Sequence, residues 1–157
     1  MMQRNVCLAL VTAVLLFSSC IAMPFPKKLP QLVPEIPDFT LQDFAEVKVM
    51  RGQGPVIVFN PLVCAQAGRA LCQFSRWHEY GHIVLGHPLR RLKPERMEIE
   101  ADRWAAQNAP RDVVLAAYYF FLSGGGASPV HGEGRQRAAR LAPYLQGELS
   151  EGLLGFR

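Results

Sequence analysis

Two histidines, His78 and His82, stand four residues apart and Glu79 directly follows the first of them. The segment from Ala65 to His87 has helical character, with a break predicted near Gly68. In an α-helix, residues i and i+4 project from one face, so both imidazoles can bind one metal ion. The spacing therefore predicts a helix that offers two nitrogen ligands to zinc. A solvent-facing histidine pair on an amphipathic helix is the alternative.

Glu79 lies one step round this helix, where its carboxylate can hydrogen-bond a zinc-bound water rather than the ion. Zinc lowers the pKa of that water towards about 7, and the carboxylate can take its proton and pass it to a leaving amine. In a chain with 4 histidines and 13 acidic residues, a chance His-Glu-x-x-His match is roughly a one-in-a-hundred event or rarer. The motif therefore predicts a zinc hydrolase.

The remaining pattern predicts an α+β fold that is mainly helical, with a small sheet or hairpin before the motif helix. The expected elements are a turn or short helix running into a strand over 39–49, a turn over 51–55, a strand at Val56–Phe59, and helices over 95–108, 112–122 and 135–145. The helix over 112–122 is strongly apolar, but a bilayer-spanning helix needs about 20 residues. We therefore expect this helix in the core.

Residues 1–22 have the pattern of a secretory signal peptide, with Arg4 before an apolar run and small residues at the exit. The segment Phe17-Ser18-Ser19-Cys20 resembles the lipobox of bacterial lipoproteins, with phenylalanine in place of the usual leucine. Lipidation of Cys20 would tether the protein to a membrane. Ordinary cleavage after Ala22 and an uncleaved anchor are the competing outcomes. The sequence thus predicts export, to the bacterial periplasm or as a lipoprotein that faces it.

Residues 23–38 are rich in proline, which predicts an extended spacer and places the globular domain at 39–157. Cys64 and Cys72 lie in this domain, and an even pair in an exported protein favours a disulfide. Eight residues of continuous helix span about 12 Å, too far for a bridge, so a disulfide requires the break near Gly68. Two buried free thiols are the alternative.

The formal net charge of +4 is modest, and several of the basic residues gather over 90–96. No aromatic residues are interleaved with them, so the sequence does not predict nucleic-acid binding. A solvated loop is the expected structure of this stretch.

The segment His78–His87, followed by Glu98-Ile-Glu-Ala-Asp102-Arg-Trp-Ala, resembles the gluzincin metallopeptidases of family M48, which are zincin-like. In that family, Glu-x-x-Ala-Asp-x-x-Ala supplies the third metal ligand from its first glutamate. The resemblance thus implies Glu98 as the third ligand of one Zn²⁺ per chain. It implies that Asp102 is a carboxylate that orients a ligand histidine. The family's spanning helices and repeat extensions are not present, which implies a minimal catalytic domain.

Two further polar residues lie near these motifs. Glu100 falls about 200° round the helix from Glu98, so we expect it to face away from the metal as a solvated charge. His87 follows His82 by five residues, and we expect it to cap or buttress the helix end rather than to bind zinc.

A stretch from His131 through Arg137 to Leu141 resembles the family's His-Pro stretch, with Gly132 in place of the proline. The resemblance implies that His131 lies near the site as a catalytic residue that stabilises the oxyanion, and that Arg137 gives structural or electrostatic support. It also implies that a polypeptide substrate binds as an added strand along Val56–Phe59.

Together these features predict a zinc endopeptidase that hydrolyses envelope proteins or peptides through a zinc-bound water activated by Glu79. One alternative is a metallopeptidase of the M78-like branch, whose mostly cytosolic members carry a similar motif; the signal peptide disfavours it. Another is a metal-binding envelope interaction protein with little catalytic turnover, which the intact Glu79 disfavours.

Overall fold

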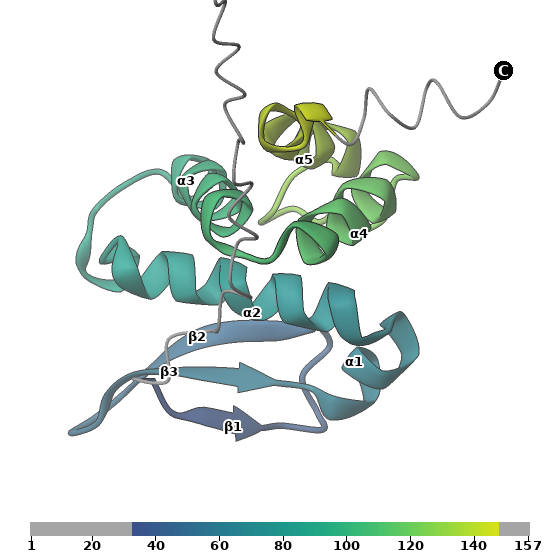
Figure 1. Ribbon diagram of the computed structural model, residues 1–157. Coiled ribbons are helices and arrows are strands. Elements are labelled where there is room, and N and C mark those ends of the chain that lie inside the picture. Colours follow the sequence, from purple (N-terminus) through teal and green to yellow (C-terminus); the bar gives the residue numbers. More distant parts are fainter. Residues whose placement is uncertain (1–32, 148–157) are drawn as a thin grey trace, which may run out of the picture.

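The computed structural model describes residues 33–147 as a small sheet and a larger helical layer (Figure 1). The strands are β1 (Glu35–Pro37), β2 (Ala45–Met50) and β3 (Gly54–Phe59), and the α-helices are α1 (Pro61–Ala67), α2 (Arg69–Val84), α3 (Pro94–Asn108), α4 (Arg111–Leu122) and α5 (Gly134–Leu141). Figure 1 shows α2 lying across the sheet, with α3, α4 and α5 on its far side. The predicted α+β class, mainly helical with a small sheet, is confirmed. The predicted signal peptide and Cys20 lie outside the described residues.

The middle strand of the sheet is β3, which pairs antiparallel with β2 through a hairpin and parallel with β1. The expected strand at Val56–Phe59 is therefore confirmed, but it is not an edge strand. Because both of its sides are already hydrogen-bonded to other strands, a substrate cannot add along it. The expected location of substrate binding is wrong for this reason.

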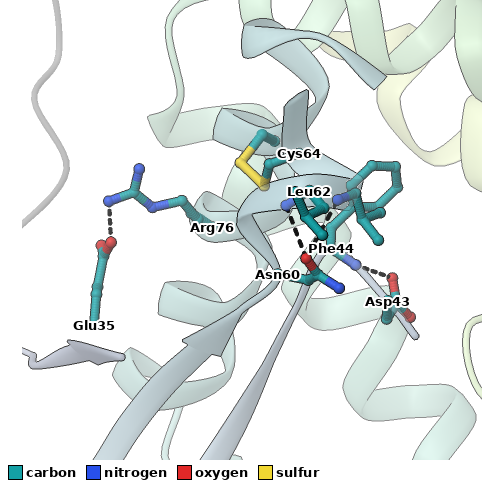
Figure 2. Close-up of a disulfide and its surroundings, with 9 residues drawn as sticks. Glu35, Asp43, Phe44, Asn60, Leu62, Cys64 and Arg76 are labelled. Carbon is teal, nitrogen blue, oxygen red and sulfur yellow. Dashed lines mark hydrogen bonds and ion pairs between the residues drawn. A yellow bond between two sulfur atoms is a disulfide. The ribbon is translucent and has the colours of Figure 1, made fainter. Parts of the chain in front are cut away.

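The strand β1 corrects the predicted domain boundary. Its residues belong to the proline-rich segment 23–38, which was expected to be a spacer, yet they pair with Ile57 to Phe59 of β3. Glu35 of β1 forms an ion pair with Arg76 of α2 (Figure 2). The globular fold therefore begins before residue 39. Between β1 and β2, residues 39–44 form turns and bends and no helix.

The other side of β2 is one of the two sheet edges that no strand covers within residues 33–147, and it is called the uncovered edge below. Asn60 donates its backbone N–H to the carbonyl oxygen of Phe44, at 3.0 Å, on the side of β3. In an antiparallel ladder, alternate residues direct both backbone groups to the same side. The alternate residues Ala45, Val47 and Val49 therefore direct theirs away from β3, towards the uncovered edge.

The predicted break in the motif helix lies at Gly68, between α1 and α2. Asn60 caps the start of α1, because its side-chain oxygen accepts the Leu62 N–H at 2.8 Å. Gly68 has φ of 93°, a left-handed value that glycine adopts without steric cost. The chain folds back here, and the Cα atoms of Cys64 and Cys72 come within 4.9 Å in a disulfide (Figure 2). The disulfide was one of two predicted alternatives, and it ties α1 to the first turn of α2.

The helices α2 and α3 pack closely at Gly81. A Cβ atom built on Gly81 would lie 3.2 Å from the carbonyl oxygen of Ala101 and 3.2 Å from the ring of Trp104. Both Gly81 and Ala101 are buried. Their small size lets the two helix backbones approach, and this approach brings the acidic face of α3 against the histidines of α2.

The apolar core lies between α2 and the outer helices. Buried residues of α4 pack against Phe74 and Trp77 of α2, as expected for a core helix: Val113, Val114, Ala117 and Phe121. Across residues 33–147, none of the helices combines the length and the apolar character needed to span a membrane.

We expect Gly81→Leu to destabilise the protein by about 1–3 kcal/mol, because the new side chain has no room against α3. The melting temperature, followed by circular dichroism, should fall by several degrees. Ala139→Leu, on the exposed face of α5, is the matched control and should change stability by less than about 0.5 kcal/mol. Equal melting temperatures for both variants would contradict the close helix packing.

Candidate metal centre

The two motif histidines project from one part of α2 towards α3. His78 and Glu79 are buried, with 2 % and 5 % of their surface exposed. The Nε2 atoms of His78 and His82 lie 3.0 Å apart. The helical i, i+4 geometry has thus brought two ring nitrogens to one point, as the spacing predicted.

Glu98 of α3 completes the cluster. Its Oε2 atom lies 3.0 Å from His78 Nε2, and its Oε1 atom lies 3.4 Å from His82 Nε2. In tetrahedral coordination with bonds of about 2.0–2.1 Å, two ligand atoms are separated by about 3.3 Å. The observed separations fit this value, and two imidazoles with one carboxylate form a donor set that catalytic zinc accepts. His78, His82 and Glu98, called the metal cluster below, could therefore hold a metal ion.

The charges around the cluster favour a cation. Burial alone would lower the pKa of His78, but its contacts with Asp102 and Glu98 outweigh burial and raise the pKa to about 9. Burial would raise the pKa of Glu98, but His78 and His82 hold it far below its usual range. The buried carboxylates thus stabilise a positive charge at the ring nitrogens, which a metal ion can supply in place of a proton.

Glu79 lies beside the metal cluster and faces the sheet. Burial raises the pKa of Glu79 to about 7, while a backbone hydrogen bond from Val47 of β2 acts in the opposite direction. Proton transfer is efficient when the catalytic group titrates near the working pH. The position and the pKa of Glu79 therefore suit a group that accepts and returns a proton.

Asp102 lies behind His78 and has no exposed surface. Its Oδ1 atom is 2.9 Å from His78 Nδ1, which leaves Nε2 of the ring for the metal cluster. Arg137 of α5 donates to both carboxylate oxygens, at 2.7 and 3.2 Å. Arg140 donates to Oδ2 at 2.9 Å. Burial would raise the pKa of Asp102, but His78 and Arg137 outweigh it and keep the group ionised.

The structure thus brings Asp102 and Arg137 to positions that suit the expected roles, and it adds Arg140. Sequence reasoning missed this arginine. The available signal was its spacing of three residues from Arg137, which puts both guanidinium groups on one face of a helix.

His82 is held from behind by His87. The two Nδ1 atoms lie 3.0 Å apart, and His87 is only 4 % exposed. The Nε2 atom of His87 lies 3.1 Å from Glu100 Oε2. With His82 Nε2 directed at the metal cluster, its Nδ1–H donates to His87, and His87 Nε2–H donates to Glu100. One tautomer of each ring is fixed in this way.

These contacts correct the expected role of Glu100. Its side chain does face away from the metal cluster, but it is more than a solvated charge. It accepts hydrogen bonds from Arg90 at 3.2 Å and Arg96 at 2.9 Å and anchors His87. The long-range contact with His87 was not visible in the helical spacing of Glu100 alone. The place of His87 agrees with the expected buttress at the helix end.

His131 reaches the site from the loop between α4 and α5. Its Nε2 atom lies 3.5 Å from Glu98 Oε2, and it can form a second metal-binding trio with His78 and Glu79. We favour the first cluster as the metal site, because its donor separations match tetrahedral coordination. Ser128 Oγ accepts the His131 N–H at 2.9 Å and lies 3.0 Å from its Nδ1 atom. Sequence reasoning missed Ser128, although Ser-x-x-His is a local turn signal.

A groove of about 600 Å³ passes over the site. Its lining includes Ala45, Val47 and Val49 of β2, and Pro88, Met97 and Val130 from outside the sheet. Side chains of the site also line it: Glu79, His82, Glu98 and His131. An extended ligand in the groove therefore reaches His82 and Glu98 of the metal cluster and Glu79.

We expect His87→Phe to lower zinc affinity by about 10–100-fold, because the ring is kept but the buried Nδ1–H of His82 loses its acceptor. Competition with a chromophoric chelator measures this affinity, and circular dichroism checks the fold. Glu95→Gln, on the exposed first turn of the same helix as Glu100, is the control and should bind zinc like wild type. Equal affinity of the two variants would contradict the His82–His87 contact.

Comparison of the chain with protein-family models, with curated proteins and with solved structures gives no match. The site itself offers a largely buried donor set that could hold one metal ion, a buried carboxyl group beside it, and a groove along a strand edge.

Proposed function

We propose that the protein is a zinc-dependent endopeptidase with a zincin-like, gluzincin type of site. The metal cluster holds one Zn²⁺, and Glu79 is the general base. The observation that carries this proposal is the set of donor separations of 3.0 to 3.4 Å in a trio whose His78 and Glu98 are buried. The groove that is lined by His82 and Glu98 of the trio and by Glu79 supports it.

A zinc ion held by His78, His82 and Glu98 would supply a Lewis acid for a peptide carbonyl and would lower the pKa of a water bound to it. Glu79 accepts the proton of the attacking water on its carboxylate and then gives it to the leaving amine nitrogen. His131 lines the same groove as Glu79, where its Nε2–H can stabilise the negative charge that develops on the carbonyl oxygen. Asp102 and His87 keep the two ligand imidazoles oriented throughout.

The substrate binds as an added strand along β2, in place of the expected site on β3. Ala45 and Val49 present both backbone groups, and Val47 presents its carbonyl, at the uncovered edge, whereas the Val47 N–H donates to Glu79. A peptide paired with this edge places a main-chain carbonyl near the metal cluster. Main-chain recognition of this kind is independent of sequence and suits a peptidase that acts on extended segments.

We also infer that the protein works in an oxidising compartment outside the cytosol. The disulfide between Cys64 and Cys72 is typical of exported proteins and rare in reducing cytosol. This location agrees with the signal peptide expected at residues 1–22.

We expect wild type to carry about one zinc per chain and to cleave an unfolded substrate such as casein. Glu79→Gln should keep the zinc and lose cleavage by a factor of about 10²–10⁴, because the proton acceptor is gone while the ligands remain. Glu98→Ala should lose the zinc, because only two ligands remain. Elemental analysis and a fluorogenic casein assay measure the two properties.

Glu95→Gln is the control in these assays and should match wild type in both. If Glu79→Gln still cleaves casein, the proposed mechanism is wrong. If wild type binds zinc and cleaves nothing, the alternative of a metal-binding protein with little turnover is correct.

Strand addition predicts that the substrate's backbone N–H groups contribute to its binding along β2. In a peptide that the protein cleaves, N-methylation at alternate residues facing β2 should raise KM by about tenfold, since each methyl group removes one donor. Methylation at the intervening residues is the matched control. Equal KM values for both series, from steady-state kinetics, would contradict binding along β2.

A further inference from the structure

A second hollow, with a volume of about 260 Å³, opens beside Glu79. It is called the apolar pocket below, and its walls come from the loop before β2, from α2, from the end of α4, from the loop after α4 and from α5. The large apolar residues of these walls are Phe44, Leu71, Phe74, Phe120 and Phe121. Four aromatic rings around one cavity next to a reactive carboxyl group are not explained by metal binding or by proton transfer.

The apolar pocket joins the groove at the reaction centre. Residues common to the linings of both spaces are Asp43, Ala45, Glu79, Ser128 and His131. A peptide that lies along β2 therefore passes the mouth of the pocket where its backbone meets Glu79. The side chain that enters the pocket belongs to a residue that flanks the scissile bond.

The walls of the pocket are held in place by ring packing. Phe74 packs edge-on against Phe121, with ring centroids 5.7 Å apart, and Phe44 packs edge-on against Phe120 at 6.2 Å. The guanidinium of Arg137 lies over the Phe121 ring at 4.2 Å. On Gly125, a Cβ atom would lie 2.5 Å from the Phe120 ring, so the loop backbone packs directly on this ring. The pocket is therefore formed before a ligand enters it.

The size and the charge of the pocket define what it accepts. An apolar cavity of about 150 Å³ is large enough for benzene, so 260 Å³ holds an aromatic or a branched aliphatic side chain. The cation of Arg137 is already paired with Asp102 and does not attract an acidic side chain. The carboxylate of Asp43, at the mouth of the pocket, repels an acidic side chain.

We propose that the apolar pocket is the specificity site of the enzyme and selects a large apolar residue, such as phenylalanine or leucine, next to the scissile bond. This inference rests on the proposed endopeptidase function. It adds the class of substrate residue that the site recognises.

The test uses the zinc-loaded protein and a combinatorial peptide library, with cut sites read by mass spectrometry. We expect large apolar residues to be enriched at one position beside the cut and acidic residues to be depleted there. In matched peptides, phenylalanine at this position should give a kcat/KM at least about tenfold higher than alanine. Cleavage without such a preference would overturn the pocket inference and leave the endopeptidase proposal standing.

Leu71→Trp should fill the pocket from its α2 wall and lower the phenylalanine-to-alanine ratio of kcat/KM about tenfold. Leu62→Trp is the matched control, since Leu62 is exposed on α1 and lies outside the pocket lining. Its ratio should equal that of wild type. Phe120→Ala is a second variant, which enlarges the pocket and should shift the preference towards tryptophan. An unchanged ratio in both pocket variants, with zinc content and circular dichroism intact, would overturn the inference.

A binding readout keeps the two proposals separate. N-acetylphenylalanine amide should bind the zinc-loaded Glu79→Gln protein about tenfold or more tightly than N-acetylalanine amide, by NMR titration, and Leu71→Trp added to this variant should abolish the difference. Equal binding of the two amides would overturn the pocket inference even if the protein cleaves peptides. Preferential binding without any cleavage by wild type would support the pocket and refute the endopeptidase proposal.

Discussion

The buried carboxylate of Asp102 joins three helices at the place where the metal cluster lies. A carboxylate without exposed surface is stable only where charges and hydrogen bonds replace its hydration. Asp102 meets this requirement through His78 of α2 and through Arg137 and Arg140 of α5. Removal of the carboxylate would leave two guanidinium groups, each largely buried, without their counterion. The helical layer and the metal cluster therefore depend on the same interaction, and the geometry of one cannot change without the other.

The two histidines of the metal cluster are supported by different chemistry. His78 is held by a charged carboxylate, whereas His82 is held by the imidazole of His87, which in turn contacts Glu100. A charged acceptor increases the basicity of a ligand imidazole more than a neutral acceptor does. The close packing at Gly81 makes both arrangements possible, because it brings α3 within reach of both rings. The sheet contributes the opposite wall, with the backbone of β2 facing Glu79.

Local spacing predicted the parts of the site that lie on single helices. The pair His78 and His82 follows from helical periodicity, and the break at Gly68 allowed the disulfide to be named as an alternative. Contacts between distant segments could not be predicted in this way. The pairing of Glu35–Pro37 with β3 is non-local and was hidden by the prolines around it. The order of the strands, which puts β3 in the middle, depends on that same pairing. The anchoring of His87 by Glu100 depends on the turn between two helices, which no periodicity describes.

The disulfide lies at one end of α2, so different contacts restrain the two ends of this helix. Cys72 is the neighbour of Leu71, which forms a wall of the apolar pocket, while His78 lies about two turns further along. The covalent link restrains the pocket end of the helix, and Asp102 and His87 restrain the ligand end. Under the proposed function, loss of the link would therefore loosen the apolar pocket before it affected the metal cluster. The proposed enzyme, in a reducing environment, would keep its ion but discriminate less among peptides.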